Sequence, residues 1–172
     1  RTRSVEPPQS DPRIFTMAED VKETQVRIGF HIPGVENPDV PALDLLSEIL
    51  GSGRSSRLYR TFRMEQRLVN SIASYSMTPE EPGIFSVSVT LEPKDVEEAL
   101  PRILQMVFDS GFEPILSEEL KTAKAQIESD FIYQMETVQG QARELGYFAT
   151  TMGDLDFGRQ YLEQIRTTTA EE

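Results

Sequence analysis

Five arginines recur in the segment after two closely spaced glycines, and by type and spacing they are the residues of this chain best placed for chemistry. They lie roughly one helical turn apart, at Arg54, Arg57, Arg60, Arg63 and Arg67. Between them Leu58, Tyr59 and Phe62 supply an apolar stripe, so the spacing predicts a helix with one face in a core and guanidinium groups on the other. Such a face could bind phosphate groups only as a local patch, because the chain as a whole is acidic.

A glycine-broken turn comes before this helix. Gly51, Ser52 and Gly53 allow backbone conformations that other residues avoid, and Ser55 or Ser56 can accept a hydrogen bond from the first free N–H groups of the helix. The turn lacks the Gly-Lys-Ser/Thr ending of a phosphate-binding loop, and it follows a helix where such loops follow a strand. From the residues alone, we interpret it as a connection.

Histidine and cysteine, the nitrogen and sulfur ligands of catalytic metals, are scarce in this chain, which excludes several kinds of catalytic site. It contains one histidine, His31, and no cysteine. A catalytic zinc site needs three protein ligands, so we expect this segment to bind no metal, and disulfide and thiol chemistry are excluded. The alternation of the surrounding strand places His31 on a polar face, where a structural or surface role is expected. Asp154 and Asp156 lack the further oxygen ligands of a calcium loop and are interpreted as caps.

Length and charge restrict the class of protein further. The 172 residues, 38% of them hydrophobic, are enough for one domain. The net charge of -12 argues against nucleic acid as a partner. No apolar run is long enough for a membrane span, and the first residues lack the core of a signal peptide, so we predict a soluble segment of unknown compartment. The early prolines and a capping-box pattern at Thr168 to Glu172 predict that residues 1–8 are a linker from an upstream domain and that 9–172 are one domain, truncated at its C-terminal end.

Hydrophobic periodicity predicts an α+β fold. Strands are predicted at residues 13–17, 25–32, 71–77 and 84–91, the last two as an antiparallel hairpin. Helices are predicted at residues 42–50, 96–111, 117–140, 141–152 and 157–166, and Pro101 is expected to kink the second of them. This order is typical of an antiparallel or mixed sheet covered on one face by helices. We expect the helices 42–50 and 117–138 to cover the hairpin.

The chain resembles the non-catalytic half-domain of the pitrilysin/insulinase family of zinc peptidases, which includes the mitochondrial processing peptidases. The resemblance runs from about Pro8 to the end and lies in the segments GFHIPGVENPDVPALDLLSEILG, GSGRSSRLYRTFRMEQRLV, SIASYS, GIFSVSVTLEP and TAKAQIESDFI. Its most specific part is the Ser-Arg-Leu of residues 56–58, together with Arg63 and the crossing from helix to strand. This resemblance implies a half-domain of the processing-peptidase type.

The resemblance also implies a division of labour between two half-domains that close around a peptide. The first half carries a His-x-x-Glu-His zinc motif, which a chain with one histidine cannot contain. The second half shapes the chamber and holds the substrate. Zinc is therefore expected in the partner half, and the implied partners are a zinc-bearing N-terminal half-domain or sister subunit and the peptide substrate. A homo-oligomer is compatible with this reading.

Specific residues follow from the family pattern. The family places an arginine and, seven positions later, a tyrosine beside the substrate carbonyl; Arg63 matches the arginine, whereas Asn70 stands in place of the tyrosine. Arg63 and Asn70 are thus the predicted substrate-binding residues, and the turn Gly51, Ser52 and Gly53 is a candidate substrate loop. No catalytic residue and no metal ligand is expected in this segment.

Two functions stay open at this point. The chain is either the non-catalytic half of a zinc-dependent peptidase, which helps to bind peptide in proteolysis, or a catalytically inactive structural or assembly member of the same fold. Asn70 favours the second reading, because its amide can donate a hydrogen bond but reaches less far than a tyrosine hydroxyl. A His-x-x-Glu-His motif upstream of Arg1 or in a neighbouring reading frame would distinguish the two.

Overall fold

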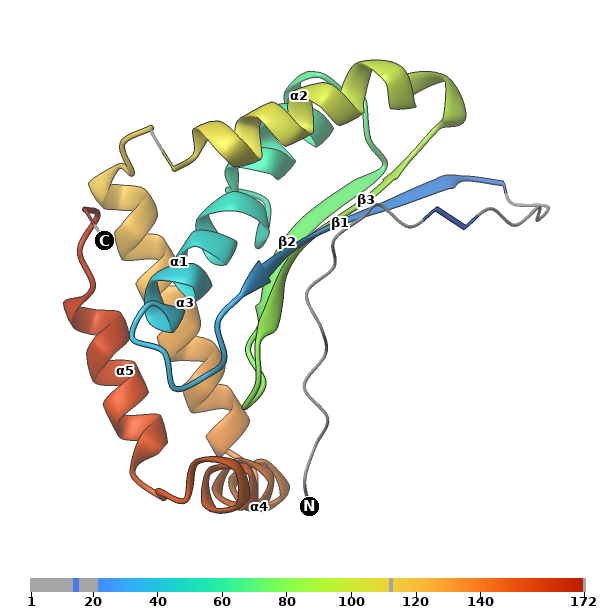
Figure 1. The fold of residues 1–172 in the computed structure, drawn as a ribbon. Coiled ribbons are helices and arrows are strands. Elements are labelled where there is room, and N and C mark those ends of the chain that lie inside the picture. The colour runs from blue at the N-terminus through green and yellow to red at the C-terminus, as the bar shows by residue number, and fades with distance from the viewer. Residues whose placement is uncertain (1–13, 16–21, 112, 172) are drawn as a thin grey trace.

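A three-stranded antiparallel sheet organises the computed structural model, which describes residues 14–15, 22–111 and 113–171. The strands are β1 (Thr24–Ile32), β2 (Ser71–Met77) and β3 (Gly83–Leu91), with β3 in the middle. The helices are α1 (Val40–Gly51), α2 (Val96–Asp109), α3 (Ser117–Met135), α4 (Val138–Tyr147) and α5 (Phe157–Thr167). Three shorter helical segments are the π-helices η1 (Tyr59–Glu65) and η3 (Phe148–Met152) and the 3-10 turn η2 (Pro93–Asp95). Figure 1 shows α1 and α2 along one side of the sheet, so the predicted α+β class is confirmed.

The register of β3 divides the sheet into two faces. Val87 lies opposite Ile28 of β1 and Ser74 of β2, and both pairings are antiparallel. Because successive strand residues point to opposite faces, every second residue of β3 faces the helices. These residues are almost fully buried: Phe85, Val87, Val89 and Leu91. The hairpin and its inward face are as the alternation predicted.

Two buried clusters divide the interior into layers. The first joins the sheet to α1, α2 and η1 through residues such as Leu50, Ile103 and Phe62. The second lies between α1, α3 and α5 and contains Leu45, Ile49, Ala123 and Ile165. The expectation that helix 117–138 covers the hairpin is therefore wrong. The helix α1 is apolar on two sides and is sandwiched between sheet and α3, whereas α3 buries only Ala123 among its described residues.

The predicted helix 117–140 is two helices in the structure. The chain leaves α3 after Met135, and Thr137 is extended, with its Oγ1 accepting a hydrogen bond from the Gly140 N–H at 3.0 Å. This cap starts α4 at Val138, whose side chain is 83% exposed rather than buried as its spacing suggested. Capping this N–H stabilises the helix start, because an N–H in the first turn otherwise has no hydrogen-bond partner within the helix.

Two further expectations have mixed outcomes. The helix α2 runs from Val96 to Asp109 with Pro101 inside it, and the kink expected at this proline stays a prediction. The strand predicted at 13–17 falls mostly outside the described residues, and Ile14 and Phe15 are exposed and lie outside the strands.

Candidate functional site

The sheet face opposite the helices is exposed along β1 and β2 and mixes polar side chains with the apolar Tyr75, Met77 and Ile84. Across it run cross-strand rows of small or polar side chains, such as Arg27, Ser88 and Ala73 in one row. His31 lies on this face, exposed, as its place in the alternation predicted. An antiparallel sheet with one packed and one open face presents a wall to solvent or to a partner.

The predicted substrate residues lie near the end of the sheet where β2 begins. Arg63 is exposed in the last turn of η1. Asn70 is exposed one residue before β2, and its backbone N–H donates to the Thr90 carbonyl oxygen at 2.7 Å. The Asn70 amide Nδ2 donates to Oε1 of Glu23 at 2.9 Å. No hydrogen bond joins Arg63 to Asn70 within the part of the chain that the structure describes, so each presents its side chain separately.

A π-helical turn and a left-handed residue connect these two positions. The Gln66 N–H donates to the Thr61 carbonyl and the Leu68 N–H to the Phe62 carbonyl, so η1 widens beyond an α-helix as it ends. Arg67 then adopts a positive φ of 58°, which costs a residue with a Cβ about 1 to 2 kcal/mol. Together they reverse the chain between helix and strand. Strained backbone of this kind often lies beside functional residues, but the periodicity of the sequence contains no signal for it.

The Ser-Arg-Leu of residues 56–58 has a structural role. Leu58 is fully buried, and Ser56 Oγ donates to the Gly53 carbonyl at 2.9 Å instead of capping helical N–H groups. Arg57 turns away from the predicted guanidinium face: its Nε and Nη2 donate to Oε1 and Oε2 of Glu119 at 2.8 and 2.7 Å. Its Nη2 also donates to the Pro114 carbonyl at 3.0 Å. The motif therefore ties the start of η1 to the start of α3.

The Glu119 carboxylate is the centre of this contact. Oε2 also accepts the Leu116 N–H at 3.0 Å, which satisfies a free donor at the start of α3. The hydrogen bond from Arg57 is the main cause that lowers the pKa of Glu119 below its usual value, and burial opposes it. In the sequence Arg57 looks like the other four arginines of residues 54–67, and its bidentate contact with Glu119 on α3 separates it from them.

The candidate substrate loop combines a packing requirement with a cavity. A Cβ on Gly51 would lie 2.1 Å from the Ser74 nitrogen, so α1 approaches β2 too closely for any side chain there. Gly53 has a φ of +72°, which favours glycine. A cavity of about 560 Å³ opens beside the loop, between Ser52, Gly53 and the first turns of α3. Arg54 and Arg60 also line it, so the loop borders a space that could admit a polar group.

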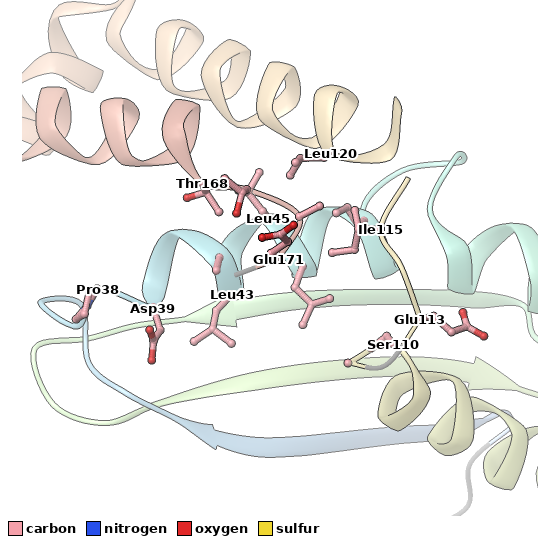
Figure 2. Close-up of a pocket in the computed structure, with 16 residues that line it drawn as sticks. Pro38, Asp39, Leu43, Leu45, Ser110, Glu113, Ile115, Leu120, Thr168 and Glu171 are labelled. Atoms are coloured by element: carbon pink, nitrogen blue, oxygen red, sulfur yellow. The ribbon is translucent and has the colours of Figure 1, made fainter. Parts of the chain in front are cut away.

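A second cavity, of about 510 Å³, lies between α1, the end of α2 and the start of α3 (Figure 2). Leu43, Leu45, Ile115 and Leu120 contribute apolar wall, and Thr168 to Glu171 pass along its rim. Arg63 and Asn70 do not line it. This cavity is thus separate from the predicted substrate residues.

The described residues do not fit a zinc ion. Among residues 14–15, 22–111 and 113–171, no three side chains of the histidine, cysteine, aspartate or glutamate types are grouped to hold a metal. The sole histidine lies exposed on the open sheet face, apart from any such group. In the same described part, no helix is both long and apolar enough to cross a membrane.

Comparison with known proteins decides the family. The family described as "Peptidase M16 inactive domain" matches residues 2–127. The chain belongs to this family. The M16 chain is 29% identical over 166 residues to the zinc protease PqqE of Helicobacter pylori, a match that covers 92% of this chain and 37% of that protein. It spans about a third of the length of the curated relatives it matches.

Solved structures agree with the M16 fold. A protease from Helicobacter pylori matches with a TM-score of 0.79 at 24% identity, over 87% of this chain and 36% of that chain. The peptidase M16 inactive domain from Pseudomonas fluorescens matches with a TM-score of 0.74 at 19% identity, over 86% of this chain and 36% of that chain. The resemblance found in the sequence is confirmed at the level of family and fold.

Proposed function

We propose that this M16 inactive domain is the non-catalytic half of a zinc-dependent peptidase and that its open sheet face forms one wall of a peptide-binding chamber. The observation that carries the proposal is the division of the sheet. One face is packed under α1 and α2, and the other is exposed along β1 and β2, with Asn70 one residue before β2 and Arg63 in the preceding η1. Zinc belongs to the partner half in this proposal, because the described residues offer no metal site.

In this function the chain binds and orients the peptide. Arg63 is exposed and has no ion pair with any residue that the structure describes, so its guanidinium is available to a substrate carbonyl oxygen. A fixed donor at a carbonyl that gains negative charge acts more strongly on the transition state than on the bound substrate. Ser52 and Gly53 line the cavity of about 560 Å³, and the loop Gly51 to Gly53 is proposed as a second contact for the peptide.

One observation favours the alternative, a structural or assembly member of the fold without peptidase activity. One of the two N–H donors of the exposed Asn70 amide is engaged by Glu23. Only the second donor is left for a substrate carbonyl, and the hydrogen bond to the charged carboxylate restricts where the amide can point. The role of Asn70 as a substrate contact is accordingly the weaker half of the proposed site.

The test is to combine the chain with a zinc-bearing half-domain and to measure turnover of a peptide library. Arg63→Ala should lower kcat by about a hundredfold to a thousandfold with little change in the melting temperature. Arg102→Ala is the matched control, since Arg102 is an exposed helical arginine on α2 whose ion-pair partner among the described residues is Glu98. Equal activities of the Arg63→Ala variant and the parent would remove Arg63 from the site. An inactive parent that gains activity through Asn70→Tyr would establish the alternative.

A further inference from the structure

A smaller cavity on the helical side of the molecule has a composition that the proposed function does not use. Its volume is about 290 Å³, and it lies where α1, the second half of α3, α4 and α5 meet. Five aromatic side chains line it: Phe131, Tyr147, Phe148, Phe157 and Tyr161. The rings of Phe148 and Phe157 have centroids 5.6 Å apart, and Phe157 and Tyr161 are stacked at 6.5 Å. We call this space the aromatic cavity.

One wall of the aromatic cavity is closely packed. A Cβ on Gly158 would lie 2.8 Å from the ring atoms of both Phe131 and Phe148. The glycine at this position therefore lets α5 approach the two rings. Val35 and Val40 also line the cavity.

The charged side chains that line the aromatic cavity are all carboxylic acids, and no lysine, arginine or histidine of the described residues lines it. The three acids are Asp44, Asp130 and Glu144. Glu144 already has Arg143 as a partner at 3.1 Å, and Asp130 accepts from the Gln126 amide at 3.0 and 3.1 Å. Asp44 is different. Its Oδ2 accepts from the Tyr161 hydroxyl at 2.6 Å and its Oδ1 from the Ser76 hydroxyl, and no cation pairs with it within the described residues.

A partly buried carboxylate held only by neutral donors is short of counter-charge. Burial raises the pKa of Asp44, and the hydrogen bonds from Ser76 and Tyr161 lower it only in part. A carboxylate offers about four acceptor positions, so two hydroxyl donors leave room for a further N–H group. The rings beside it present negative faces, which attract a cation within about 6 Å of their centroids. Both features favour the same kind of ligand.

We propose that the aromatic cavity binds a primary alkylammonium group, with Asp44 as its counter-ion and the rings of Phe148, Phe157 and Tyr161 around its aliphatic stem. The volume sets the size, because drug-sized ligands occupy pockets of about 300 to 1,000 Å³ and this cavity lies at the lower limit. It fits a single chain such as a lysine side chain or a small free amine. A carboxylate or phosphate ligand is disfavoured by Asp44, Asp130 and Glu144.

The test follows backbone amide resonances of the 172-residue chain by NMR at neutral pH while three probes are added separately. They are n-butylammonium, N-acetyl-lysine N-methylamide and the norleucine derivative, which keeps the stem but lacks the charge. The cations should shift resonances of residues around Asp44 and Gly158 saturably, and norleucine should bind at least about tenfold more weakly. Preference for n-butylammonium would identify a site for free amines, and preference for the lysine derivative a site for a peptide side chain.

Two variants keep the proposal testable. Asp44→Asn should weaken binding of both cations by at least about tenfold, whereas Asp39→Asn, an exposed aspartate before α1 and outside the cavity, should leave it unchanged. Tyr161→Phe keeps the ring and the carboxylate and frees one acceptor position, so it should bind the cations as tightly as the parent or more tightly. Equal shifts from lysine and norleucine derivatives, or no saturable shift in the parent and Tyr161→Phe, would overturn the proposal even if Asp44→Asn does not fold. The measurement requires neither zinc nor a partner half, so it is independent of the proposed peptidase function.

Discussion

Replacing Arg57 by alanine should lower the free energy of unfolding by about 3 kcal/mol. The Arg57 and Glu119 side chains are only 11% and 20% exposed, and the pair is bidentate with Nη2–Oε2 at 2.7 Å. The substitution removes two hydrogen bonds to the carboxylate and one to the Pro114 carbonyl, each to be counted at about 1 to 3 kcal/mol. The total is smaller than their sum, because water reaches the exposed fifth of Glu119 and the Leu116 N–H still binds it.

The assay is guanidinium denaturation followed by circular dichroism, with Arg102→Ala as the control. The Arg102–Glu98 pair is exposed and lies within one helix, so its loss should cost about 0.5 kcal/mol or less. Arg57→Lys should cost less than Arg57→Ala but more than the control, because lysine keeps the charge and loses the planar fork. A double-mutant cycle with Glu119→Gln should give a coupling of more than about 1 kcal/mol.

Acid provides a second measurement of the same contact. The folded-state pKa of Glu119 lies below its ordinary value of 4.5, so its contribution is present above pH 4.5 and is lost as the pH falls through the lower folded value. The difference in stability between parent and Arg57→Ala should therefore shrink in acid. If Arg57→Ala and Arg102→Ala destabilise equally, or if the difference is the same at acid and neutral pH, the assignment of the Ser-Arg-Leu motif to this pair is refuted.

Three further predictions concern packing and charge. Val87→Asp should unfold the domain at room temperature, as measured by circular dichroism, because it places a charge in a fully buried site. Ala73→Asp, on the exposed sheet face, should fold, and a folded Val87→Asp variant would reverse the assignment of the faces. Gly51→Ala should lower the free energy of unfolding by at least about 2 kcal/mol in the guanidinium assay, because its Cβ would clash with Ser74. Gly146→Ala, in open space on α4, should raise it by about 0.5 to 1 kcal/mol, and similar effects at both glycines would contradict the close approach of α1 to β2. The folded-state pKa of Asp44 is raised above 3.8 by burial, so the stability that protonated Asp44 contributes is fully present below that pH and is lost as the pH rises. Glu48, Asp130 and Tyr161 are other ionisable groups near it. Asp44→Asn should make the fall in stability shallower as the pH rises above about 3.8, and an unchanged slope would contradict it.

The strands and α1 could be predicted because their signals are local. Alternation in residues 84–91 names the buried face of β3 without knowledge of any partner, and the apolar run after Pro41 is long enough to predict α1. The helix boundary at Thr137 was missed, although a threonine three residues before Gly140 is a capping pattern. Its polar signal competes with an apolar periodicity that continues through Val138, so the periodicity alone predicts one helix where the structure has two.

The position of α3 could not be derived in the same way. The sequence indicates that α3 has an apolar stripe, but the choice between packing on the sheet and packing on α1 depends on which surfaces the other elements leave uncovered. Because α2 and η1 already cover the sheet beside α1, α3 and α5 pack on the far side of α1. Which helix covers which surface is therefore decided only when all the elements pack together.

The candidate site divides along the same line. By itself the sequence determined the family and the presence of a single histidine on a polar strand face, because residue type and spacing carry that information. Arg63 and Asn70 follow only from the family pattern and stay predictions as substrate residues. Only the tertiary structure decided that Arg57 leaves the guanidinium face for Glu119, that Asn70 donates to Glu23, and that Asp44 meets Tyr161 at an aromatic cavity. These pairs are separated by 62, 47 and 117 residues, and a contact across such separations is set by the packing of whole helices and strands rather than by any local pattern.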